Sequence, residues 1–398
     1  MKIGTAKAIL LAPVYSPYPA GGAQSFPIVA AALSKLFKSV LVITEYHPCR
    51  PYVCNESGVS VLRILPVRDN KGSKSYLYSL ASYWLTQILL ISFLLALRLL
   101  GFQTLHYTRY SSYCLSLLLV LWRALGGLVV YDCRTMALGE RSLRALKRSL
   151  GTANAALANS ESALNSVLQL SKVPITSYIV NPLLLPSKDE IPLLSRFPSL
   201  ARLANKPYIL CLGTLSPRKN SLLVLQAFEF FLARKALVTI SPNPLPSIEY
   251  SQLKLVYAGR SDLSKSSLER LISSDSVVYL GPVSHLESLA LTSAASLSIN
   301  ISNAEGIPRS MLEALYLQVP CILPSCVPEF LRYLPEVCID IPHSDPASIS
   351  ALASLISILL QDPDRVRNLL SKYPIDAHLV DNYHNLIFEK IYRHFYAI

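Results

Sequence analysis

The chain has 398 residues, of which 52% are hydrophobic and 16% are charged, and its net charge is +12. This length accommodates two α/β domains of ordinary size, and this composition excludes a disordered chain. The basic surplus favours an anionic partner, either a phosphate-bearing small molecule or an acidic membrane surface. Because the cations are scattered and not interleaved with exposed aromatic residues, no nucleic-acid partner is expected.

Short apolar runs alternate with helical patterns in the first half of the chain, which is typical of βαβ units and a parallel sheet. Strands are predicted at residues 8–13, 40–44, 59–65, 103–107, 128–132, 155–158 and 177–180. The first helix is predicted from about residue 22 to residue 37. These elements predict an N-terminal Rossmann-like domain over residues 1–183.

The periodic pattern stops between residues 184 and 206, a proline-rich stretch that we expect to be an interdomain linker. Further strands are predicted at residues 208–213, 253–258, 277–280, 297–301, 320–323 and 337–340. They predict a second Rossmann-like domain over residues 207–375, followed by a C-terminal helix at 376–398 that packs back on the first domain. Ligands bind at the carboxyl ends of such sheets, so two domains facing each other would form a ligand cleft.

Residues 75–97 carry no charge and are long enough to span a bilayer, which needs about 20 apolar residues. Their position between two predicted strands of one sheet instead favours a helix on that sheet or at a membrane surface. A predicted helix at about residues 140–150 has a basic face, made by Arg141, Arg144, Lys147 and Arg148. These segments favour peripheral docking on the inner face of a membrane, and the alternative for the basic helix is a solvated surface.

Eight cysteines are spread along the chain, and none belongs to a C-x-x-C pair. Several lie in apolar runs, so we expect most of them to be small buried hydrophobic side chains of a protein in a reducing compartment. No secretory signal is visible near residue 1, so a cytoplasmic protein is expected. The cysteine spacing offers no zinc site.

Two predicted loops carry groups suited to phosphate. Gly21 and Gly22 open the first helix, where backbone N–H groups favour anions, although a Gly-Gly pair also fits a plain strand-to-helix turn. Arg218 and Lys219 lie between the end of a predicted strand and the start of another helix. A guanidinium and an ammonium there would clamp a diphosphate, and the alternative is a solvated basic turn.

The strongest candidate is the segment 303–314, in which Glu305 precedes a predicted helix and Glu313 lies about two turns into it. Ionised carboxylates accept hydrogen bonds, so this pair could hold two hydroxyl-rich parts of one ligand, such as a hexose and a ribose. The alternative is a helix-start glutamate stabilised by the dipole and an ordinary helical glutamate. Glu313 stands in an apolar stretch, which disfavours an unpaired charge there.

Residues 305–313 resemble the Glu-x7-Glu signature of the family-4 retaining glycosyltransferases. The Pro-Arg-Lys-Asn run at 217–220 and the Gly-Gly loop at 21–24 resemble two further motifs of that family. Residues 131–134 are similar to a subgroup with an Asp-x-Arg where other members place a histidine. The resemblance implies the GT-B fold, an α/β fold with two Rossmann-like domains facing across a cleft.

The resemblance also implies an activity: transfer of a hexose-type sugar, with retention, from a nucleotide-diphospho-sugar to a saccharide or lipid-linked acceptor in glycan or polysaccharide biosynthesis. It assigns donor binding to Gly22, Arg218, Lys219, Glu305, Gly306, Ile307, Pro308 and Glu313. Glu305 and Arg134 are the expected catalytic residues, and His106 and Arg109 are alternatives for acceptor contact. No metal or cofactor is implied, because the cations neutralise the departing diphosphate. The pair Ile307-Pro308 replaces the aromatic-Gly pair commoner in the family, so the sugar pocket is expected to differ.

Two other functions remain open at this stage. A non-hydrolysing nucleotide-sugar epimerase shares the architecture, but its pattern lacks the Arg-Lys-Asn loop and this spacing of glutamates. A catalytically silent, membrane-associated scaffold would keep the fold without needing Arg218, Lys219, Glu305 and Glu313. The base, the sugar and the acceptor depend on a few pocket side chains and on loops, which fold-level patterns do not specify.

Overall fold

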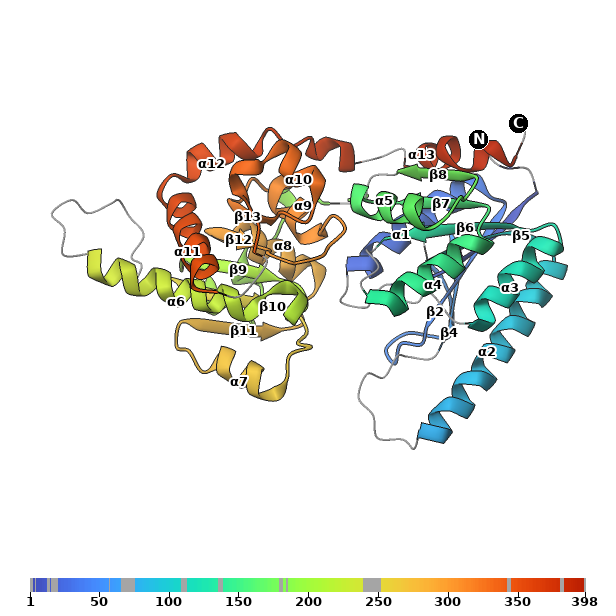
Figure 1. The fold of residues 1–398 in the computed structure, drawn as a ribbon, viewed down its shortest axis with the longest axis horizontal. Coiled ribbons are helices and arrows are strands. Elements are labelled where there is room, and N and C mark those ends of the chain that lie inside the picture. The colour runs from blue at the N-terminus through green and yellow to red at the C-terminus, as the bar shows by residue number, and fades with distance from the viewer. Residues whose placement is uncertain are drawn as a thin grey trace. The chain divides into compact units, whose positions relative to one another are not determined.

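The computed structural model describes residues 3, 5–12, 15, 21–56, 58–65, 76–108, 113–134, 139–178, 182–183, 185–238, 252–341, 345–379 and 383–396. The chain divides into two compact units (Figure 1). The first comprises Met1–Pro182 and Val380–Ile398, and the second comprises Leu183–Leu379.

The first unit is built on an eight-stranded sheet in the order β3-β4-β2-β1-β5-β6-β7-β8. Its strands are β1 (Lys7–Leu11), β2 (Ser39–Glu45), β3 (Val53–Glu56), β4 (Val59–Leu65), β5 (Phe102–Thr108), β6 (Leu128–Cys133), β7 (Ala155–Ala158) and β8 (Ile175–Tyr178). All neighbouring strands are parallel except β3 and β4, which form an antiparallel pair. The edge strand β3 was missed from the sequence because its four residues are half exposed and form no apolar run.

Helices cover both faces of this sheet. On one face lie α1 (Gly21–Leu36) and α13 (Tyr383–Lys390), and on the other lie α2 (Tyr76–Leu99), α3 (Tyr113–Ala124), α4 (Gly139–Thr152) and α5 (Glu161–Leu170). Side chains of β1 alternate between the two cores, with Leu10 facing the first layer and Ile9 the second, as the period of a strand requires. Through α13 the C-terminal segment belongs to this unit. In the described part of the chain, none of the helices has the length and apolarity needed to cross a membrane.

The second unit has a six-stranded, fully parallel sheet in the order β11-β10-β9-β12-β13-β14. Its strands are β9 (Tyr208–Leu212), β10 (Lys254–Ala258), β11 (Val277–Gly281), β12 (Leu297–Ile299), β13 (Cys321–Pro324) and β14 (Cys338–Ile339). Its helices are α6 (Ser221–Val238), α7 (Lys265–Ile272), α8 (His285–Ser293), α9 (Arg309–Tyr316), α10 (Pro328–Tyr333), α11 (Pro346–Gln361) and α12 (Pro363–Leu370). The strand order reverses between β9 and β12, and this is where open α/β sheets bind ligands.

Residues 184–206, which we expected to form a linker, belong to the second unit. They contain three short 3-10 turns, Lys188–Glu190, Leu194–Arg196 and Ala201–Leu203. Their side chains Leu194, Leu200 and Leu203 are buried in the core of that unit. Isolated 3-10 turns have no 3.6-residue period, which is why the sequence pattern resembled a linker.

Candidate functional site

The loops that follow β9 and β12 are joined at the carboxyl edge of the second sheet. The Asn220 side-chain amide donates to the Ile301 carbonyl oxygen over 2.9 Å and to the Asn303 side-chain oxygen over 2.6 Å. The Asn303 backbone N–H in turn donates to the Arg218 carbonyl oxygen. Asn220 has a φ of 52°, in the left-handed region that asparagine tolerates better than most residues. This residue therefore ends the 3-10 turn Pro217–Lys219 and fixes the Arg218-Lys219 pair against the second loop.

Two glycines allow the strands to end so close together. Gly213 and Gly259 follow β9 and β10 with φ values of 125° and 143°. A Cβ on Gly259 would overlap the carbonyl group of Gly213. At Gly213 a Cβ would lie 3.2 Å from the Lys219 ammonium. Both positions therefore require glycine if the Lys219 side chain is to lie over the end of β9.

Glu305 lies beside both cations of the first loop. Its Oε1 is 3.0 Å from Arg218 Nη1 and 3.1 Å from Lys219 Nζ, and it accepts a hydrogen bond from the Ser302 hydroxyl. Burial alone would raise the pKa of Glu305, but the charges of Lys219 and Arg218 outweigh it and hold that pKa below its ordinary value. The carboxylate is thus ionised at neutral pH and neighbours two positive groups. The structure brings together Arg218, Lys219 and Glu305, three of the expected donor-binding residues.

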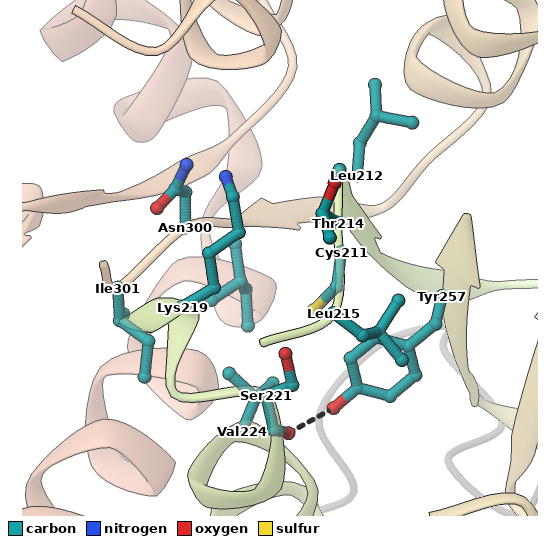
Figure 2. Close-up of a pocket in the computed structure, with 12 residues that line it drawn as sticks. Cys211, Leu212, Thr214, Leu215, Lys219, Ser221, Val224, Tyr257, Asn300 and Ile301 are labelled. Carbon is teal, nitrogen blue, oxygen red and sulfur yellow. Dashed lines mark hydrogen bonds between the residues drawn. The ribbon is translucent and has the colours of Figure 1, made fainter. Parts of the chain in front are cut away.

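A shallow pocket lies beside Lys219 at the end of β9 (Figure 2). Its void of about 20 Å³ has room for about one water molecule. Asn300 and Tyr257 also line it, and the Tyr257 hydroxyl donates to the Ser221 carbonyl oxygen over 2.7 Å. The Asn300 side-chain nitrogen is buried and has no hydrogen-bond partner among the described residues. This unsatisfied donor belongs to a residue that lines the pocket beside Lys219, and nothing in the sequence pattern singled it out.

Glu313 is held in a second cluster on α9. Its Oε1 lies 3.0 Å from His285 Nε2 and 3.2 Å from Arg309 Nε, and its side chain is only 4% exposed. Gly306, Ile307 and Pro308, the other expected donor-binding residues, are buried in the turn between Glu305 and α9. His285 was not expected from the sequence. The only signal for its position is the capping box of Ser284 and Glu287, which makes His285 the first residue of α8.

The Asp-Cys-Arg run of the first unit forms a buried ion pair at the end of β6. Arg134 Nε lies 2.9 Å from Asp132 Oδ2, and the guanidinium stacks over the Phe26 ring. Burial opposes both charges, yet each group stabilises the other. The pKa of Asp132 is therefore lowered by Arg134 and His106, and the pKa of Arg134 is raised by Asp132. Asp132 Oδ1 and Arg134 Nη1 are buried without a hydrogen-bond partner in the described residues.

The two expected acceptor residues have different outcomes. His106 is fully buried, with Nδ1 at 3.0 Å from the Tyr392 hydroxyl and Nε2 at 3.4 Å from Asp132. His106 therefore has no exposed surface with which to contact an acceptor. Instead it lies beside Asp132, the carboxylate that pairs with Arg134. Arg109 lies outside the described residues. Gly22 lies in the first turn of α1, as predicted.

Across the described ranges, no group of three or more His, Cys, Asp or Glu side chains is arranged to hold a metal ion. The charged groups gathered at the ends of β9 and β12 are instead two cations and one carboxylate.

Residues 196–373 match the family model described as glycosyl transferases group 1, and this span includes both loops and both glutamates. No curated protein matches the sequence.

Several solved structures match nearly the whole chain. HepE of Anabaena in complex with UDP is 15% identical, with a TM-score of 0.64, and the match covers 98% of this chain and 100% of that one. Sucrose-phosphate synthase from Thermosynechococcus elongatus is 19% identical, with a TM-score of 0.69 and coverage of 98% and 99%. A UDP-forming trehalose-phosphate synthase from Burkholderia xenovorans in complex with glucose-6-phosphate is 12% identical, with a TM-score of 0.68 and coverage of 96% and 99%. At such identities the likeness establishes the fold, and the predicted class of two Rossmann-like α/β domains, GT-B, is confirmed.

Proposed function

We propose that this chain, which has the GT-B fold and carries the glycosyl transferases group 1 domain in residues 196–373, is a retaining hexosyltransferase that uses a nucleotide-diphospho-sugar. The observation that carries the proposal is the contact of Arg218 and Lys219 with Glu305 where the strand order reverses. Two cations suit a diphosphate, and a carboxylate beside them suits the hydroxyl groups of the attached sugar.

In this proposal the diphosphate binds to Arg218 and Lys219 and takes over part of their contact with Glu305. The Glu305 carboxylate, ionised because of its low pKa, then accepts hydrogen bonds from the sugar. Backbone groups of Gly306 and Ile307 approach the sugar or the phosphate. At the other end of the donor, Glu313 accepts hydrogen bonds from the ribose, and its contact with Arg309 orients it.

The chemistry needs no covalent enzyme intermediate. The bond between the sugar C1 and the phosphate oxygen breaks, and the acceptor oxygen forms its bond to C1 on the same face, so the configuration is retained. The proton of the acceptor hydroxyl passes to the departing phosphate. Arg218 and Lys219 stabilise the negative charge that develops on that phosphate, which is the role a metal ion has in other transferases, and no metal is required.

The acceptor is proposed to be a saccharide or a lipid-linked saccharide, and Gly22 and Arg134 of the first unit are proposed to act on this reaction. The ion pair with Asp132 fixes the Arg134 guanidinium at the carboxyl end of β6, where α/β sheets place ligands. The enzyme would work in the cytoplasm, on the inner face of a membrane.

Calorimetry of the full chain with UDP, GDP, ADP and their common sugars tests the proposal. One nucleotide should bind, and Lys219→Ala should weaken it while Lys265→Ala, at a solvent-exposed cation of the same unit, should not. If no nucleotide binds to folded protein, the catalytically silent scaffold becomes the better-supported hypothesis. If a bound donor is converted to its epimer without an acceptor, the epimerase is supported instead.

A further inference from the structure

Helices α2, α3 and α4 form one side of the first unit (Figure 1). Leu94 of α2, Trp122 of α3 and Leu146 of α4 share one core against the same face of the sheet. The middle helix, α3, packs against both of its neighbours. Because all three helices turn their inner faces to one sheet, their outer faces belong to one continuous surface.

This surface is unusually apolar. On α2, α3 and the turns that follow them, eight large hydrophobic side chains are 37% to 81% exposed: Ile88, Leu89, Leu99, Leu100, Leu117, Val120, Leu121 and Leu125. On α3 the exposed positions 117, 120, 121 and 124 recur with the helical period, so they form one outward stripe. Single exposed leucines are normal on soluble proteins, but a joined set on two packed helices marks an interaction site.

The charges of these three helices are mostly positive. Together α2, α3 and α4 contain six cations and one acidic residue, Glu140. Beside the apolar stripe, α4 contributes Arg144 and Lys147, both exposed, and no acidic residue follows Glu140 in that helix. The apolar area is therefore bordered by a net positive charge.

We propose that this α2–α4 surface docks on an anionic lipid bilayer, with the leucines in the acyl boundary and the cations among the headgroups. A helix face that joins apolar and basic side chains in this way lies in the plane of a membrane interface. A second copy of the chain fits less well, because a two-fold dimer places the same patch on itself and so sets cations against cations. Docking here would bring the enzyme to a lipid-linked acceptor. That acceptor rests on the proposed function, whereas the docking itself is argued from the surface alone.

Flotation of the full chain with vesicles tests the docking surface. Vesicles of phosphatidylcholine with one-third phosphatidylglycerol should bind the protein, vesicles of phosphatidylcholine alone should bind it far less, and high salt should weaken the binding. The double substitution Leu117→Gln with Val120→Gln should lower partition into anionic vesicles about tenfold. The matched control is Leu168→Gln on α5 of the same unit, because Leu168 and Leu117 are both 58% exposed.

A charge variant separates the two contributions. Arg144→Gln with Lys147→Gln should remove most of the preference for anionic vesicles, and Lys265→Gln in the second unit should leave it unchanged. Thermal unfolding of each variant checks that the fold is kept.

Three outcomes would overturn the inference: no binding to anionic vesicles, equal binding by the Leu117→Gln/Val120→Gln protein, or a lipid-free dimer that the same double substitution dissociates. Nucleotide calorimetry, run in parallel, keeps the two proposals apart, because Arg218, Lys219, Glu305 and Glu313 lie in the second unit. If the protein binds nucleotide but no vesicles, only the proposed docking surface is refuted. If it binds vesicles but no nucleotide, only the proposed donor site is refuted.

Discussion

The Lys219 ammonium lies 3.1 Å from Oε1 of Glu305 and so ties the loop after β9 to the loop after β12. The two residues are far apart in the sequence and meet because β9 and β12 are neighbours where the strand order reverses. Lys219 is only 18% exposed, so its charge is less screened by solvent than that of Arg218, which is 42% exposed. In the proposed donor complex, the diphosphate would meet cations that are already held in place.

Lys219→Met is expected to weaken binding of the nucleoside diphosphate about 10- to 100-fold, because one charge-assisted hydrogen bond contributes about 1.5–3 kcal/mol. Arg218→Met should have a smaller effect, because its more exposed guanidinium is better screened. Calorimetry with the diphosphate and with the unphosphorylated nucleoside measures both. Equal losses for the two ligands would show that Lys219 does not act on the phosphates.

Glu305 should make the free energy of unfolding fall as the pH is lowered. Its folded pKa lies below the ordinary value of 4.5, so the ionised side chain stabilises the fold fully above that pH. This contribution is lost as the pH falls through the lower folded pKa. Wild-type protein should therefore be about 1–3 kcal/mol more stable than Glu305→Gln at pH 7, and the difference should shrink below about pH 4.5. Urea unfolding from pH 7 to pH 3 follows it, and a difference that grows on acidification contradicts the assignment.

Gly259→Ala is expected to distort the Lys219 loop. A Cβ there meets the Gly213 backbone, and the φ of 143° is itself unfavourable for alanine. The two effects together should cost about 2–4 kcal/mol of unfolding free energy and weaken nucleotide binding. Gly281→Ala is the matched control, because Gly281 has a φ of 69° in the same sheet but open space around it. It should cost about 1–2 kcal/mol, and equal losses for both variants would mean that crowding at Gly213 is unimportant.

The fold was largely predictable because buried parallel strands appear in the sequence as short apolar runs. In the second unit β9, β10 and β11 lie within a residue or two of their predicted positions. The exceptions lack that signal. The edge strand β3 is half exposed, and the turns between 188 and 203 bury single leucines without a helical period. Such elements are specified by tertiary packing rather than by local pattern.

The site was predictable only in part. Arg218, Lys219 and Glu305 were all singled out from the sequence, and they meet because all three follow strand ends at one edge of the sheet. His285 and Asn300 were not foreseen, since a single histidine or asparagine has no spacing partner in the sequence. His106 shows the opposite case: its place at a strand near the expected site suggested acceptor contact, and tertiary packing under Tyr392 buries it.

Arg134→Lys should separate transfer from donor binding. Lysine keeps the charge beside Asp132, so the buried carboxylate keeps a partner, but it loses the planar guanidinium that stacks on Phe26. Nucleotide affinity should stay within about twofold, because Arg218, Lys219 and Glu313 lie in the other unit. The transfer rate should fall about 10²–10³-fold, as for loss of one positioned electrostatic group. Tyr383→Phe is the control, since it removes only a 3.5 Å contact to Arg134. An Arg134→Lys enzyme with wild-type turnover would exclude Arg134 from the reaction and leave the Asp132–Arg134 pair a purely structural role.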